Sequence, residues 1–112
     1  MGLFDRFRRG RRGGPEVDAA ADHRYLVEWA RARTGVEAYV EPQTSVTEVT
    51  VVLVANDGEW TRRRAGGASG ARRLGEELHI PVYDVQRVGY PQRMRDFDAR
   101  RRAERRRAGE ES

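Results

Sequence analysis

The stretch from Thr47 to Arg64, T-E-V-T-V-V-L-V-A-N-D-G-E-W-T-R-R-R, constrains the fold more than any other part of the chain. The second half of the segment Val46 to Ala55 favours a strand in the middle of a sheet, because its residues are apolar on both faces. Asn56-Asp57-Gly58 supplies residues that tolerate positive φ in a tight turn. The segment Glu59 to Arg64 returns as a charged strand, so the stretch predicts a β-hairpin.

Helical and extended patterns surround this hairpin. They predict the following elements: a helix over Asp18–Thr34, a strand over Gly35–Glu41, a helix over Ser69–Leu78, a strand over Val82–Gln86, a turn over Arg87–Tyr90 and a last helix from Pro91. The order α-β-β-β-α-β-α predicts an α+β fold with a mixed four-stranded sheet. In this fold an antiparallel meander gains one further strand, and the helices pack on the sheet.

Residues at the helix ends refine this prediction. Asp18 or Asp22 suits the N-cap of the first helix, and Ser69 suits the N-cap of the second. His79 follows the second helix at the position where glycine usually adopts the left-handed conformation. We therefore expect His79 to have a structural role.

The two ends of the chain are basic and its middle is mildly acidic. This pattern predicts a basic flexible arm at 1–17, one small domain at 18–97 and a charged helical or disordered tail at 98–112. Met94 and Phe97 are the last side chains that we expect to pack on the domain. A core of this size is marginal, and a homodimer would stabilise it.

All 22 basic residues are arginine, and the chain has no cysteine. The absence of cysteine excludes disulfides, zinc–thiolate sites and thiol chemistry. No apolar run reaches the roughly 18 residues of a membrane-spanning helix, so we expect no integral membrane segment and a cytoplasmic location. We also expect no cofactor and no metal, because neither histidine lies in a recognisable motif.

The predicted order of elements is also that of the PD-(D/E)xK nuclease core. Glu28, Glu48 and the triplet Glu59-Trp60-Thr61 occupy the positions of that family's acidic residues and of its (D/E)-x-K triplet. Threonine stands where the lysine belongs, and arginine cannot replace it as a base at neutral pH. The pattern therefore indicates at most a degenerate nuclease core.

Two further alternatives rest on short segments. The glycine-rich turn Gly66–Gly70 opens a helix whose free N–H groups suit an anion, although neither a dinucleotide fingerprint nor a Walker pattern accompanies it. A flexible connection explains that turn more simply. Leu3, Phe4 and Phe7 lie among arginines at the start of the chain, which suits a peripheral contact with an anionic membrane.

Arginine clusters favour a binding or interaction module, with nucleic acid or protein as its partner, over an enzyme. Pleat geometry puts Trp60, Arg62 and Arg64 on one face of their strand. An aromatic ring beside positive charge suits the bases and phosphates of nucleic acid. Tyr90 and Arg93 complete the candidate binding set if they lie on the same side, although no named nucleic-acid motif is present.

Three patterns link the folded part to a known family. They are V-E-x-x-V-E-P at Val36–Pro42, T-V-V-L-V-A-x-D-G-E-W-T-R-R-R at Thr50–Arg64 and I-P-V-Y-D-x-x-x-V-G-Y-P-Q-R-M-R-D at Ile80–Asp96. In these the chain resembles a family of short actinobacterial proteins, some of which are labelled oxidoreductase. The resemblance thus implies redox activity, for which the residues supply neither a cysteine nor a nucleotide fingerprint nor a metal-ligand set.

Overall fold

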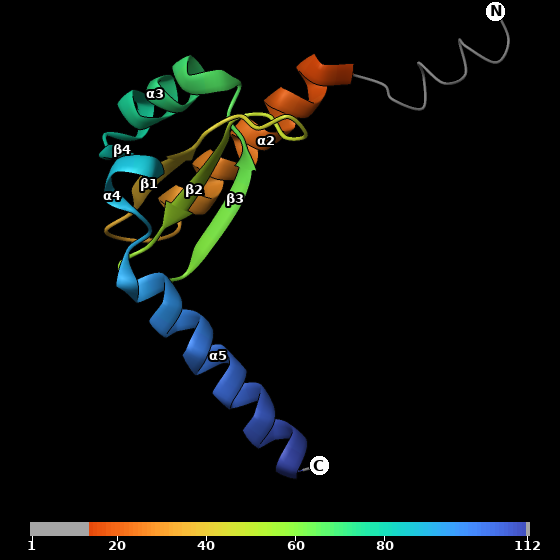
Figure 1. Cartoon of the computed structure of the whole chain (residues 1–112), viewed down its shortest axis with the longest axis vertical. Helices are drawn as coiled ribbons and strands as arrows, with labels where there is room; N and C mark the ends of the chain where they lie inside the picture. Colours follow the sequence, from red (N-terminus) through yellow and green to blue (C-terminus); the bar gives the residue numbers. More distant parts are fainter. Residues whose placement is uncertain (1–13, 112) are drawn as a thin grey trace, which may run out of the picture.

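A computed structural model describes residues 14–111 of the chain. In chain order the elements are α2 (Gly14–Arg31), β1 (Glu37–Glu41), β2 (Thr50–Val54), β3 (Trp60–Arg64), α3 (Gly67–Leu78), β4 (Val82–Asp84), α4 (Val85–Val88) and α5 (Gln92–Glu111) (Figure 1). The predicted α+β order is confirmed. The short helix α4 was not predicted, and it overlaps the segment predicted as a turn.

The four strands form one mixed sheet in the order β3-β2-β1-β4. β1, β2 and β3 pair antiparallel as the predicted meander, and β4 joins β1 in parallel. β2 lies inside the sheet, and its residues from Val51 to Val54 are fully buried. The first strand of the predicted hairpin, β2, therefore lies in the interior of the sheet, and its second strand, β3, lies at one edge.

Two apolar clusters cover β2, one on each face. On the first face Val51 and Leu53 pack with Leu26 and Trp29 of α2 and Leu74 of α3. The second cluster is smaller and is formed by Tyr39, Val52, Val54 and Met94, with Trp60 packed against it. Full burial of one such aliphatic side chain stabilises a fold by about 1.5 to 3 kcal/mol, so both faces need a cover.

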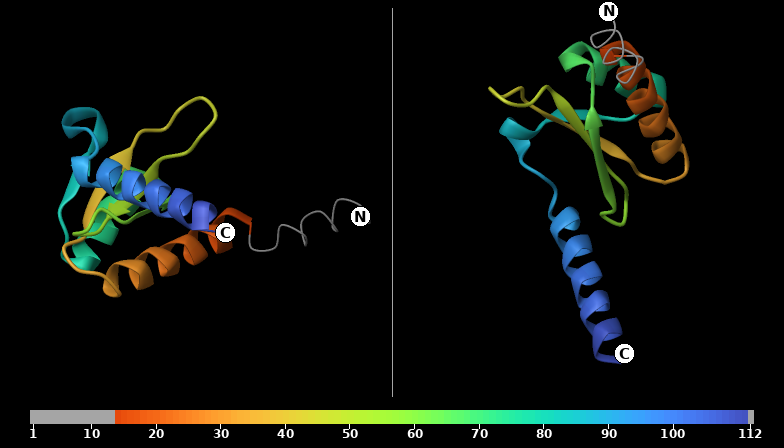
Figure 2. Two further views of the ribbon diagram at one scale, coloured as in Figure 1. Left: turned by 90° about the horizontal axis from the view of Figure 1, so that it is seen from below. Right: turned by 90° about the vertical axis from the view of Figure 1, so that its right-hand side faces the viewer.

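The first turns of α5 supply the cover of the second face. Met94 is buried there, and Phe97 lies against the hairpin turn at Gly58. Two polar contacts hold the same turns: the Trp60 Nε1–H donates to Asp98 Oδ1 over 3.0 Å, and Arg100 donates to the Asp57 carbonyl over 2.8 Å. Beyond these contacts α5 runs away from the sheet, and its C-terminal half stands clear of the other elements (Figures 1 and 2).

Both predicted helix caps are wrong. The first helix begins at Gly14, so Asp18 and Asp22 lie inside it. Proline is favoured in the first turn of a helix, and alanine is the best helix former, so Pro15 and the alanines after Asp18 support this earlier start. The N-cap of α3 is Gly66, which makes no side-chain cap, and Ser69 lies inside the helix.

All four predicted strands are longer than the observed ones, and side-chain hydrogen bonds explain where β2 begins and where β4 ends. β2 begins at Thr50 rather than Val46, because the Thr44 hydroxyl accepts hydrogen bonds from the Val46 and Thr47 N–H groups and closes a turn there. β4 ends at Asp84, whose carboxylate caps α4 by accepting from the Gln86 N–H. His79 does adopt the predicted left-handed conformation after α3, with φ 55° and ψ 45°.

The predicted domain limits fall inside continuous helices. α2 extends across the limit at 17/18, and α5 extends across the limit at 97/98 up to Glu111. The side chains of the predicted basic arm at 1–17, with its proposed membrane contact, lie outside the described ones.

Gly58 is the residue at which the hairpin and α5 approach most closely. Its φ is +95°, and a Cβ atom built there would lie 2.0 Å from the Arg93 carbonyl oxygen and 3.0 Å from the Phe97 Cβ. The substitution Gly58→Ala should lower the free energy of unfolding by about 2 kcal/mol, because it adds strain at positive φ and displaces α5. Thermal unfolding should show a midpoint lower by about 10 °C.

Gly109→Ala is the matched control for this prediction. Gly109 lies in α5, and a Cβ atom there would meet nothing within 4 Å. Alanine stabilises an exposed helix relative to glycine, so Gly109→Ala should not lower the midpoint. Equal midpoints for Gly58→Ala and the unchanged chain would show that α5 does not rest on the hairpin in this way.

Candidate functional site

One face of the sheet is only partly covered, and most of the predicted binding residues lie on it. We call it the open face and define it as the sheet face opposite α2 and α3, with these members: Glu37, Tyr39 and Glu41 of β1, Thr50, Val52 and Val54 of β2, Trp60 and Arg62 of β3, and Tyr83 of β4. The start of α5 covers its apolar end through Met94. Its other end carries polar side chains that α5 does not cover.

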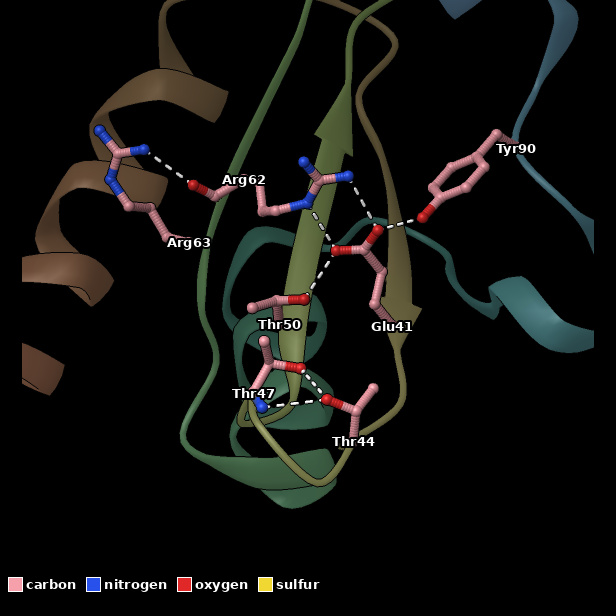
Figure 3. Close-up of polar contacts among 7 residues, drawn as sticks. All are labelled: Glu41, Thr44, Thr47, Thr50, Arg62, Arg63 and Tyr90. Atoms are coloured by element: carbon pink, nitrogen blue, oxygen red, sulfur yellow. Dashed lines mark hydrogen bonds and ion pairs between the residues drawn. The ribbon is translucent and has the colours of Figure 1, made fainter.

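Glu41 is the centre of that polar end (Figure 3). The Arg62 guanidinium donates to both carboxylate oxygens of Glu41, over 2.6 Å and 2.9 Å. The Thr50 hydroxyl donates to Oε1 over 2.6 Å, and the Tyr90 hydroxyl donates to Oε2. The carboxylate therefore connects three strands of the sheet with the segment between α4 and α5.

The ionisation of Glu41 reflects these partners. Burial alone would raise its pKa, since a desolvated carboxylate resists ionisation. The hydrogen bonds from Arg62, Thr50 and Tyr90 outweigh burial and lower the pKa from 4.5 to about 2. Burial and the neighbouring carboxylate in turn raise the pKa of Tyr90, so the phenol stays protonated and keeps donating.

A second carboxylate, Glu37, holds the start of α5. Arg93 donates to Glu37 over 2.5 Å and to the Ala55 carbonyl over 3.0 Å, and the Tyr39 hydroxyl donates to the same carboxylate over 3.0 Å. Burial raises the pKa of Glu37, but these hydrogen bonds lower it by more. Arg93 is thus a structural link between α5 and the two central strands.

Aromatic rings lie between these two ion pairs. The guanidinium carbon of Arg62 is 5.3 Å from the centroid of the Trp60 ring, within the range of a cation–π contact. The rings of Tyr39 and Tyr83 are 5.3 Å apart between centroids and are tilted by 33°. Tyr39 is buried, whereas Tyr83 and Tyr90 are each 36% exposed.

The structure brings four of the five predicted binding residues to the open face: Trp60, Arg62, Tyr90 and Arg93. Arg64 is the exception. Its guanidinium lies 3.1 Å from Asp22 of α2 and 3.5 Å from Glu48, so it is directed away from Glu41. The alternation of the strand predicted the face correctly for Trp60 and Arg62, but a long side chain at a strand end can turn toward a nearby acid.

The residues of the nuclease alternative do not converge. Glu59 forms a fork with Arg33, with both N···O distances at 2.9 Å, and the Thr61 hydroxyl is hydrogen-bonded to Tyr25. Glu28 and Glu48 are exposed. Within residues 14–111 no group of three or more histidine, aspartate or glutamate side chains is arranged to hold a metal ion.

The glycine-rich turn contributes to a small cavity between α2 and α3. Gly66 and Gly67 have φ of +74° and +79°, and His23, Arg64 and Arg73 lie among the residues around the cavity. The exposed His23 of α2 is hydrogen-bonded to Glu77 of α3 over 2.9 Å.

Glu41 was not among the predicted site residues, although a signal for it existed. Glu41 has the same parity as Glu37 and Tyr39 along β1, so alternation alone placed it on that face. What the sequence did not give was the register that sets Glu41 beside Thr50 and brings Arg62 within reach. Strand register depends on packing between segments that are distant along the chain.

Comparison of the chain with protein-family models, with curated proteins and with solved structures gave no match. The resemblance to the actinobacterial family and the redox activity that it implies therefore stay predictions. None of the helices in the described part of the chain combines the length and the apolar character needed to cross a membrane.

Glu41→Gln should reveal how much its charge stabilises the fold. Because the pKa of Glu41 is lower in the folded chain, the stabilisation is complete above pH of about 4.5 and is lost as the pH falls toward about 2. We expect Glu41→Gln to lower the free energy of unfolding by about 2 kcal/mol at neutral pH. This is less than the full pKa shift would give, because Arg62 is partly exposed and solvent screens the ion pair. Urea unfolding across this pH range should show the two proteins converging in acid.

Glu48→Gln is the control, because the Glu48 side chain is 73% exposed in its pair with Arg64. An exposed ion pair contributes about 0 to 1 kcal/mol, so this variant should follow the unchanged chain at every pH. A constant stability difference between Glu41→Gln and the unchanged chain down to pH of about 2 would show that the ionised Glu41 carboxylate does not stabilise the fold in this way.

Proposed function

We propose that the protein is a non-catalytic nucleic-acid-binding module and that the exposed arginines of α5 contact the phosphate backbone. The observation that supports this proposal best is the positive charge exposed along α5. Seven exposed arginines and three acids lie between residues 95 and 107, which gives a net charge of +4. The arginines are Arg95, Arg100, Arg101, Arg102, Arg105, Arg106 and Arg107.

Three arginines around the sheet are less suited to this role, because acids of the same domain already hold them. Arg33 is paired with Glu59, Arg62 with Glu41 and Arg93 with Glu37 at N···O distances of 2.5 to 2.9 Å. A phosphate would have to displace a well-placed carboxylate at each of these positions. Such charge-assisted forks are among the stronger hydrogen bonds of a protein.

The arginines of the outer half of α5 differ in this respect. In the described part of the chain no ion pair joins Arg102, Arg105, Arg106 or Arg107 to an acid. Arginines occur on several sides of this helix, which has no apolar stripe beyond Phe97. A helix that is polar all round gains nothing from a hydrophobic neighbour but suits a polyanion.

Binding of this kind is electrostatic and therefore depends on salt. Each phosphate that a basic side chain neutralises releases counterions, so the logarithm of the binding constant falls linearly with the logarithm of the salt concentration. The slope is about 0.9 per phosphate contact on duplex DNA and about 0.7 on a single strand. The chemistry needs no fixed pocket and no metal. It needs accessible positive charge on a firm support, which the packed start of α5 provides through Met94 and Arg93.

The triple substitution Arg102→Gln, Arg105→Gln, Arg106→Gln tests this proposal. Fluorescence anisotropy with a labelled oligonucleotide, titrated over salt, should show weaker binding and a salt slope reduced by about 2 to 3. The packing of the domain should persist, because all three side chains are exposed and lie beyond the turns that contact the sheet.

A matched triple variant removes the same charge elsewhere: Arg24→Gln on α2, Arg72→Gln on α3 and Arg87→Gln on α4, all exposed positions. It should keep the slope of the unchanged chain. No binding at low salt, or an equal loss for both triple variants, would refute the proposal that α5 is the phosphate contact.

A further inference from the structure

The open face has a property that the α5 helix lacks. It carries two ion pairs, Glu41–Arg62 and Glu37–Arg93, and the two charges cancel within each pair. The face therefore presents aromatic surface with little net charge. The exposed arginines of α5 begin directly beside it, at the end of the face that Met94 covers. Neutral aromatic surface suits bases, and the helix beside it suits phosphates.

Aromatic rings on this face are accessible and firmly held. Tyr83 and Tyr90 are each 36% exposed. Tyr83 packs on the ring of Tyr39, and the Tyr90 hydroxyl is bound by Glu41, so neither ring is a loose surface side chain. Figure 3 shows Tyr90 beside the Arg62 guanidinium with Glu41 between them. A planar guanidinium that a fork fixes in place is itself a stacking surface for a base.

We propose that the open face binds the unpaired bases of single-stranded nucleic acid through Tyr83 and Tyr90 while α5 holds the phosphates; this rests on the proposed function. Stacking on a tyrosine requires a base whose face is accessible, and inside a duplex both faces of each base are covered by its neighbours. The charge of α5 alone would attract both forms. The aromatic face therefore adds a preference for the single strand.

The double substitution Tyr83→Leu, Tyr90→Leu separates the two contributions. The probes are a labelled oligothymidine of about 12 nucleotides and the duplex made by adding its complement, at equal salt. We expect the unchanged chain to bind the single strand about tenfold more tightly than the duplex. The double variant should lose about tenfold or more on the single strand and keep its affinity for the duplex.

Two controls address the fold and the position of the rings. Tyr83→Phe with Tyr90→Phe keeps both rings and removes only the hydroxyls, so it should lose far less affinity than the leucine variant. Tyr25→Leu removes a ring that is 37% exposed on α2, on the other side of the sheet, and should leave binding unchanged. Circular dichroism and thermal unfolding verify that each variant is folded.

The outcomes distinguish this inference from the function on which it rests. Equal affinity for single strand and duplex, unaffected by the leucine variant, would overturn the role of the open face and leave α5 as the phosphate contact. A loss with the phenylalanine variant as large as with the leucine variant would also overturn it, because the hydroxyls would then carry the effect. No binding of either probe at low salt would refute both proposals.

Discussion

The burial of β2 on both of its faces is the constraint on which the rest of the structure depends. Val51 and Leu53 need one cover and Val52 and Val54 need another, since all four are fully buried. α2 and α3 provide the first cover, and the start of α5 provides the second. Because the apolar part of the second face is small, one buried methionine and two turns of helix suffice, and the rest of α5 remains in solvent.

This arrangement divides the arginines of the chain into two groups. Arg33 after α2, Arg62 and Arg64 on β3 and Arg93 at the start of α5 form ion pairs with Glu59, Glu41, Asp22 and Glu37 respectively. They position the strands and the helix and are largely neutralised. Among the described residues, no acid forms an ion pair with the outer arginines of α5, which are Arg102, Arg105, Arg106 and Arg107. A high arginine content therefore says little about binding until the acids that face each arginine are known.

The sequence predicted the topology well because its signals are local. Alternation, the turn at Asn56–Gly58 and the apolar run of β2 each follow from neighbouring residues, as does the left-handed His79. Both helix caps were wrong, because α2 begins earlier and α3 begins after Gly66 without a side-chain cap. The predicted start of β2 and end of β4 were wrong, because Thr44 closes a turn and Asp84 caps α4. The candidate site was predicted in part. Trp60 and Arg62 followed from pleat geometry, whereas the role of Glu41 and the turn of Arg64 toward Asp22 depend on contacts between distant segments.

The most direct test of the account is a titration of the isotope-labelled chain with oligothymidine, followed by backbone amide NMR. If binding belongs to α5 and the open face, the largest shift changes should fall on α5 between residues 100 and 107 and around Tyr83 and Tyr90. Amides of α2 and of Gly66–Gly70, on the other side of the sheet, should remain unchanged. Shift changes centred on α2 and the glycine-rich turn, with α5 unaffected, would contradict the claim that binding belongs to α5 and the open face.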